Sequence, residues 1–253
     1  MRSLRILVTT ALLTLAAWAA HAQPPPGSLT PIQIAVACAP RPTTSGGAPT
    51  GALRVIGAQD TIPRSLFGQR DLLVVNGGTA NGVQLGQQYF VRRRVGFGMA
   101  YGNQSPHTIR TAGWIRVVAV NNTTAIATVE HGCDGIVEGD YLDPFATPIV
   151  PPDADRADTS GALDFSSLSR VLFGDEERRT GGTGEYMVID RGADEGVSPG
   201  AHFAVYRDLG IGGLPLTSIG EVTVVSTSPT MAVVRINQAR DAVQSGDLVV
   251  PRR

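Results

Sequence analysis

The chain has 253 residues, and its 21 basic and 22 acidic side chains give a formal net charge of −1 at pH 7. This length accommodates one large or two small domains. The charge balance excludes the strongly basic class of nucleic-acid-binding proteins, because those proteins gather positive charge to neutralise phosphates. We therefore expect no nucleic acid partner.

A pattern typical of secretion opens the chain. Arg2 and Arg5 precede an apolar run over residues 6–20, and residues 20–22 (AHA) have the small-residue spacing of a signal cleavage site. The apolar run is too short for a membrane span of about 20 residues. We expect a signal peptide at 1–22 and a periplasmic or secreted mature chain with no stable membrane span.

Residues 23–50 form a proline-rich leader that opens with three consecutive prolines. Apolar residues alternate over Pro31–Cys38, which predicts a short strand there. The chain has two cysteines, Cys38 and Cys133. In an oxidising compartment such a pair is expected to form a disulfide, which here ties the leader to the first domain.

Two stretches of the chain are copies of each other. Residues 72–93 match 186–207, and residues 113–144 match 220–251, each without a gap. The identical positions include turn glycines, core valines and an arginine: Gly78 and Gly192, Gly82 and Gly196, Gly86 and Gly200, Val91 and Val205, Arg93 and Arg207. Such a repeat predicts one folding unit built twice.

The period inside each copy is two residues, which is typical of half-buried strands. Ile115, Val117 and Ala119 alternate with their neighbours, as do the matching residues of the second copy. We predict five strands per copy, near 72–76, 88–94, 114–120, 124–130 and 141–145 and their equivalents. Five short strands avoid exposed edges by curling into a barrel. The predicted fold is all-β, with two tandem five-stranded, partly closed, SH3-like barrels at 51–147 and 185–253.

Residues 148–184 are polar and interrupted by prolines and glycines, so we interpret them as a linker. Leu163, Leu168, Val171 and Leu172 have roughly helical spacing, which predicts a short linker helix. The tripeptide Leu-Phe-Gly occurs at 66–68 and again at 172–174, just ahead of each copy. We interpret each as a plug that caps the open end of its barrel.

No catalytic or metal-binding motif is found, and we expect no cofactor and no metal. Asp140 and Asp247 occupy matched turns, where an aspartate typically accepts backbone N–H bonds. The alternative is acid–base chemistry at a site between the barrels, with His131 or His202 contributing. Arg92–Arg94 is the one dense basic cluster, and we interpret it as a solvated strand end.

Candidate binding residues lie where the copies disagree. The first copy has an insertion on a glycine-rich loop that carries Phe97, Met99 and Tyr101, and it has Trp114 where the second has Glu221, which is expected to face outward. Exposed aromatic side chains form recognition surfaces. The alternatives are a loop that folds back on its barrel and a tryptophan that packs between the barrels or under the loop at 97–101.

Three motifs of the second copy carry a family resemblance. Gly192–Arg207 reads G-x-x-x-G-V-x-x-G-x-x-F-x-V-x-R, Gly220–Val224 reads G-E-V-x-V, and Gly246–Pro251 reads G-D-x-V-V-P. This pattern resembles the C-terminal β-barrel domain of the flagellar assembly protein T family. The resemblance implies a β-barrel fold of a kind that also occurs in other exported bacterial envelope proteins.

These observations favour a non-catalytic exported protein of the bacterial envelope. Its expected role is a binding or scaffold module for an envelope protein or for peptidoglycan. One alternative is a small exported hydrolase with its site between the barrels. A further alternative makes one barrel a spacer and only the other a binder.

Overall fold

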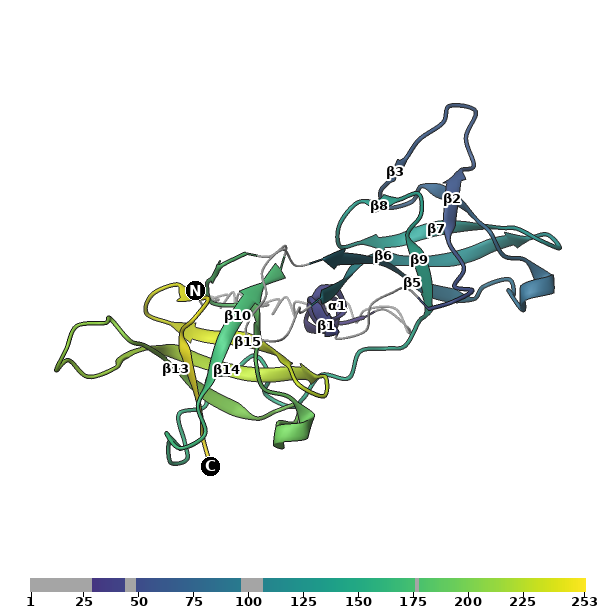
Figure 1. Cartoon of the computed structure of the whole chain (residues 1–253). Helices are drawn as coiled ribbons and strands as arrows, with labels where there is room; N and C mark the ends of the chain where they lie inside the picture. Colours follow the sequence, from purple (N-terminus) through teal and green to yellow (C-terminus); the bar gives the residue numbers. More distant parts are fainter. Residues whose placement is uncertain (1–28, 44–48, 97–106, 176–177) are drawn as a thin grey trace, which may run out of the picture.

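The structure is a computed structural model that describes residues 29–43, 49–96, 107–175 and 178–253. It contains two β domains with one short α-helix between them (Figure 1). The prediction of an all-β fold with two domains is confirmed. No helix in the described ranges is long and apolar enough to cross a membrane.

The first domain is a curled six-stranded sheet in the order β2-β4-β7-β6-β5-β9. Its strands are β2 (Val55–Ala58), β4 (Leu72–Val75), β5 (Gln88–Gly96), β6 (His107–Val120), β7 (Ala125–Gly132) and β9 (Tyr141–Pro144). The two edges meet at a bridge between Arg54 and Tyr141. A small ribbon of β3 (Leu66–Phe67) and β8 (Ile136–Val137) lies off this sheet, and the 3-10 turn η1 (Thr79–Asn81) follows β4.

The second domain is a closed barrel in the order β10-β12-β15-β14-β13-β17. Its strands are β10 (Ser169–Gly174), β12 (Tyr186–Ile189), β13 (His202–Arg207), β14 (Thr217–Thr227), β15 (Ala232–Ala239) and β17 (Leu248–Pro251). The ribbon of β11 (Thr180–Gly181) and β16 (Val243–Gln244) corresponds to β3 and β8, and η3 (Ala193–Glu195) corresponds to η1. The two domains therefore share one strand order, as the repeat predicts.

Each domain curls a path of six strands, and β1 (Arg41–Thr43) pairs with β6 as a seventh strand of the first sheet, so the prediction of five strands is wrong. The additional strands, β2 and β10, lie upstream of the region where the copies match. Strand β10 falls inside the segment 148–184, which places the start of the second barrel at Ser169 rather than at residue 185. Val171 and Leu172 are on this strand, and no α-helix occurs in the described part of 148–184. Strand β10 pairs with β12 and β17, which closes the barrel and satisfies the backbone hydrogen-bonding groups of β10. This pairing is worth more than the helical spacing of four apolar residues, so the predicted linker helix does not form there.

The two Leu-Phe-Gly tripeptides occupy different elements, so they are not equivalent plugs. Phe67 is on β3 and lies in the core of the first barrel. Phe173 is on β10, where a bulge after Val171 shifts the pairing, and it packs outside the barrel core in a cluster shared with the helix.

Helix α1 (Pro31–Cys38) occupies the segment for which the alternation predicts a strand. Its first turn has a capping box, in which the Gln33 backbone N–H donates to Thr30 Oγ1 at 3.3 Å and the Thr30 N–H donates to Gln33 Oε1 at 2.8 Å. Pro31 occupies the first turn, where its missing N–H costs no hydrogen bond. These start signals outweigh the alternation of four apolar residues.

The helix is apolar on two sides because it packs against both barrels. Ile32 and Val36 of the helix and its C-cap residue Ala39 join the cluster on the second barrel, with spacings of four and three residues. Ile34, Ala37 and Cys38 join the cluster on the first barrel. Such spacing is that of two helical faces. Strand β1 (Arg41–Thr43) then pairs antiparallel with the first residues of β6, His107–Ile109.

Candidate binding groove between the barrels

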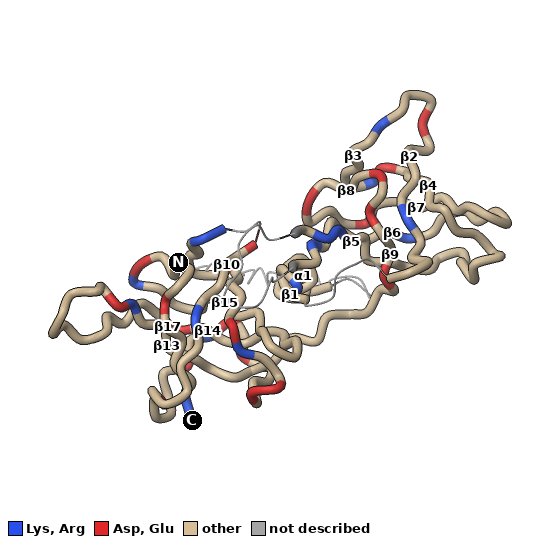
Figure 2. The backbone as a smooth tube through the Cα atoms, viewed as in Figure 1, with Lys and Arg blue, Asp and Glu red and all other residues tan. Residues whose placement is uncertain are grey.

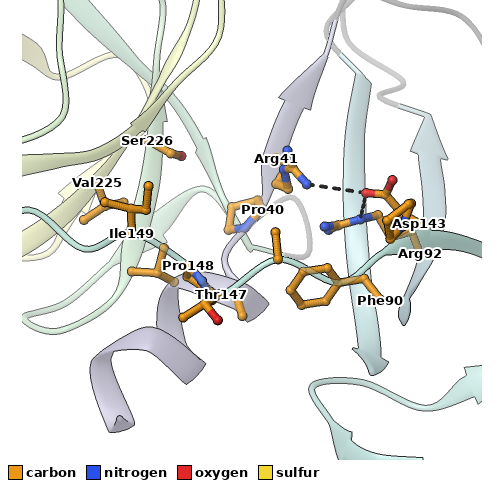
Figure 3. A pocket seen from close by; sticks show the side chains of 14 residues that line it. Pro40, Arg41, Phe90, Arg92, Asp143, Thr147, Pro148, Ile149, Val225 and Ser226 are labelled. Carbon is orange, nitrogen blue, oxygen red and sulfur yellow. Dashed lines mark hydrogen bonds and ion pairs between the residues drawn. The ribbon is translucent and has the colours of Figure 1, made fainter. Parts of the chain in front are cut away.

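A groove of about 410 Å³ lies where the helix and both barrels meet (Figure 3). Helix α1 and the segment after it form one wall, β5 and β9 of the first barrel form another, and Val225 and Ser226 of β14 contribute from the second barrel. Ala146, Pro148 and Ile149 line it from the connection between the domains. Its volume is within the range of small-ligand sites, and most of its lining is aliphatic.

Arg92 is the buried charge of this groove, with 3% of its surface exposed. Its Nε donates to Asp143 Oδ2 at 2.8 Å and its Nη1 donates to Thr111 Oγ1 at 2.7 Å. Its guanidinium lies 4.5 Å above the centre of the Phe90 ring. Because Arg92 pairs across the sheet with Thr111 and Phe90 with Asp143, strand register brings this group together.

A second arginine shares the same carboxylate. Arg41 Nη1 lies 3.9 Å from Asp143 Oδ2, and Figure 3 shows both arginine side chains directed toward Asp143. Burial lowers the pKa of Arg92, and the neighbouring charge of Arg41 lowers it further, while Asp143 raises it. Two guanidinium groups on one carboxylate leave an excess of one positive charge in the groove.

The basic cluster at 92–94 is therefore not a solvated strand end. Arg92 is buried in the groove, and Arg93 forms two hydrogen bonds of 2.8 Å with Asp140. Nε of Arg94 is buried without a hydrogen-bond partner among the described residues. Acidic and basic residues are otherwise mixed over both barrels (Figure 2).

Trp114 lies behind the groove rather than on its surface, with 6% of its residue surface exposed. Its ring stacks on His131 at 4.4 Å and meets the edge of Phe90 at 6.2 Å. Phe145 completes this aromatic cluster, which packs under helix α1. Of the two alternatives for Trp114, packing fits this geometry. Phe97, Met99 and Tyr101 lie outside the described residues.

The second barrel has an ion pair where the first has these aromatic rings. Glu221, the counterpart of Trp114, accepts hydrogen bonds of 2.6 and 3.0 Å from Arg252, the counterpart of Phe145. Arg252 also donates to the Thr159 carbonyl, so the connection between the domains covers this place. Glu221 lies outside the barrel core and is buried because this connection covers it.

Cys38 and Cys133 form the expected disulfide, which fastens the end of helix α1 to the residue after β7. This bond is consistent with an oxidising location outside the cytoplasm. Cys38, His131 and Cys133 are also the one group of three potential metal ligands in the described ranges, with donor atoms within 4.8 Å of one another. With the sulfurs bonded to each other, only His131 remains as a donor. Burial lowers the pKa of His131.

The four residues of the alternative hydrolase site have separate partners. Asp140 accepts from the Val137 N–H at 2.9 Å, and Asp247 accepts from the Gln244 N–H at 2.7 Å, as expected for turn aspartates. His131 stacks on Trp114, and His202 shares a hydrogen bond with Thr223. Within the described contacts, none of the four touches another, and the carboxylate nearest to one of the two histidines belongs to Asp158, whose Oδ2 lies 3.9 Å from His202 Nε2.

The groove residues Arg41, Arg92 and Asp143 were not singled out as a site from the sequence. A signal existed, because the copies also disagree there: Arg92 faces Tyr206 and Asp143 faces Val250 in the alignment of the repeats. No family model and no curated protein matches the chain.

Proposed function

We propose that the chain is a non-catalytic binding or scaffold module of the bacterial envelope that holds its partner in the groove between the barrels. The observation that carries this proposal is a groove built jointly from helix α1 and both barrels, with aliphatic walls and a buried arginine. A few fixed polar groups in an apolar concavity are typical of ligand sites. The signal-like N-terminus and the disulfide support an exported location.

A shared groove also favours one of the open alternatives about the barrels. Val36 and Phe90 line it from the helix and the first barrel, and Val225 lines it from the second. A barrel that served only as a spacer would leave this site incomplete. We therefore expect deletion of either barrel to remove binding. The resemblance to the flagellar assembly protein T barrel remains a prediction about fold and setting.

The test uses protein produced and exported from the full 253-residue sequence. Capture of binding partners from an envelope extract and co-sedimentation with purified peptidoglycan are measured side by side. Ile149→Gln removes an aliphatic side chain that is 90% exposed at the groove, and Leu85→Gln removes one that is 71% exposed elsewhere. Losing the burial of one such side chain weakens binding by about tenfold.

The proposal predicts that Ile149→Gln weakens capture of a partner or of peptidoglycan and that Leu85→Gln does not. The proposal is contradicted if the protein captures no partner and does not co-sediment with peptidoglycan. It is also contradicted if both variants bind to the same extent. Circular dichroism of both variants checks that the barrels remain folded.

A further inference from the structure

We propose that the ligand of the groove is an acidic peptide segment of a partner protein, with a carboxylate beside aliphatic side chains. This inference rests on the proposed function and names its ligand class. Asp143 is the one acidic side chain among the described residues that line the groove, and it faces both Arg41 and Arg92, so one positive charge has no counterpart in this lining. A carboxylate from outside supplies that counterpart.

Burial strengthens this charge argument. Only 4% of the Arg92 side chain is exposed, and its guanidinium has lost most of its hydration. A poorly hydrated cation next to a second cation is stabilised by an incoming anion more than a solvated surface cation is. The Arg41 side chain is 54% exposed and lies beyond hydrogen-bond distance of Asp143, so its guanidinium can turn toward a ligand. Planar guanidinium groups also bind carboxylates with two hydrogen bonds.

The aromatic geometry favours a peptide over a glycan. Sugar rings typically stack on an open aromatic face, and Phe90 is the one aromatic side chain in the lining of the groove. One face of Phe90 is covered by Arg92, and Trp114 and Phe145 pack around the ring, which leaves only 4% of the residue exposed. The remaining lining is mainly aliphatic and matches apolar side chains.

Glu176 and Glu177 are the acidic residues of the chain outside the described ranges, because residues 1–28, 44–48 and 97–106 contain no aspartate or glutamate. The double variant Glu176→Gln, Glu177→Gln tests whether the chain itself supplies the anion. Tighter binding of acidic peptides by this variant would contradict a separate molecule as the source, and unchanged binding supports one.

The experiment selects ligands from a library of random seven-residue peptides displayed on phage, with purified peptidoglycan as a parallel probe. Selected peptides are synthesised with their acidic residues intact and with each replaced by its amide. Arg41→Gln removes the exposed cation of the groove, and Arg41→Lys keeps its charge. Arg116→Gln is the matched control, because Arg116 is 44% exposed and paired with Glu130 on the first barrel.

We expect the selected peptides to be enriched in aspartate or glutamate. Their amide versions are expected to bind about tenfold more weakly or worse, because a charged hydrogen-bonded contact is lost. Arg41→Gln should weaken binding of the acidic peptides to a similar extent without affecting binding of their amide versions. Arg41→Lys should restore part of the affinity, added salt should reduce it, and Arg116→Gln should leave it unchanged.

Several results overturn the inference. The inference fails if the library yields neutral peptides. It also fails if the protein binds peptidoglycan and Arg41→Gln weakens that binding. A third contradicting result is concentration-dependent self-association that Arg41→Gln abolishes. If Ile149→Gln weakens partner capture while Arg41→Gln and salt do not, the groove remains a binding site and only the acidic ligand class is wrong. If neither variant affects capture, the proposed function fails as well.

Discussion

Asp247 binds one arginine in a buried turn, and the same arginine also binds an exposed aspartate. Arg207 donates to Asp247 at 2.8 and 2.9 Å and to Asp241 at 2.9 Å. The Asp247 side chain is 4% exposed, whereas the Asp241 side chain is 64% exposed. Solvent screens the exposed pair, so the two carboxylates should contribute very differently to stability.

We predict that Asp247→Ala lowers the free energy of unfolding by about 3 kcal/mol, because it leaves the partly buried Arg207 guanidinium with only the solvent-screened carboxylate of Asp241 and removes the acceptor of the Gln244 N–H. Asp241→Ala, the matched control, should lower it by less than about 1 kcal/mol. Urea denaturation followed by circular dichroism measures both. Equal losses in the two variants would show that burial does not decide the strength of these pairs.

We expect the stability of the aromatic cluster to depend on pH through His131. Burial lowers its pKa below the ordinary value of 6.5, so the unfolded chain takes up the proton more readily than the folded one. This contribution to stability is present above pH 6.5 and is lost as the pH falls through the lowered pKa of the folded state. We predict that His131→Gln reduces the fall in melting temperature between pH 6.5 and pH 5. As a control, the melting temperatures of the two proteins are also compared at pH 8, where the imidazole is neutral in both states. If the melting temperature of His131→Gln falls between pH 6.5 and pH 5 as much as that of the unchanged protein, the prediction is contradicted.

Helix α1 illustrates how an element is decided by its ends and by its neighbours. Ile32, Ile34 and Val36 satisfy a two-residue period, yet Thr30 and Gln33 form the capping box of a helix. Burial on two opposite sides requires apolar residues on both, which a short sequence displays as alternation. The capping signal was readable in the sequence, but the two-sided burial was not.

The disulfide holds this helix against the first barrel across a sequence separation of 95 residues. We predict that the double variant Cys38→Ser, Cys133→Ser loses about 4 kcal/mol of stability, because a long loop becomes unconstrained in the unfolded state. Trp114, the one tryptophan outside the expected signal peptide, should become more solvated as the helix loosens. Thermal unfolding and the tryptophan emission maximum measure both effects. An unshifted emission maximum would mean that the helix stays docked without the bond.

The 3-10 turn η3 depends on a glycine that the repeat shares. A Cβ on Gly192 would collide with the backbone carbonyl oxygens of Ser228 and Pro229, whereas one on Gly212 meets no atom within 4 Å. We predict that Gly192→Ala costs about 2 kcal/mol or more, because backbone must move to admit the methyl group. Gly212→Ala should be close to neutral. Urea denaturation distinguishes the two, and equal stabilities would contradict the prediction.

The arrangement of the two barrels depends on the helix between them (Figure 1). Val36 packs in the cluster on the second barrel, while Cys38 is bonded to the first. We predict that Val36→Asp weakens the contact with the second barrel and increases the radius of gyration, because a carboxylate replaces an apolar contact. Small-angle X-ray scattering measures this change. Val118→Asp, at a valine that is 43% exposed, is the control, and an equal radius for both variants argues against a bridging role for the helix.

The duplicated β architecture, the turn aspartates and the cysteine pair can be predicted from the amino-acid sequence, because they depend on local period, on turn chemistry and on compartment. Shared glycines such as Gly78 and Gly192 mark matching turns without any knowledge of the fold. The sixth strands, the burial of Trp114 and Arg92, and the groove become visible only in the folded chain. Each depends on segments far apart in the chain: β10 on β17, and Arg92 on Thr111 and Asp143. A linear pattern carries no information on which distant strand or helix covers a given side chain.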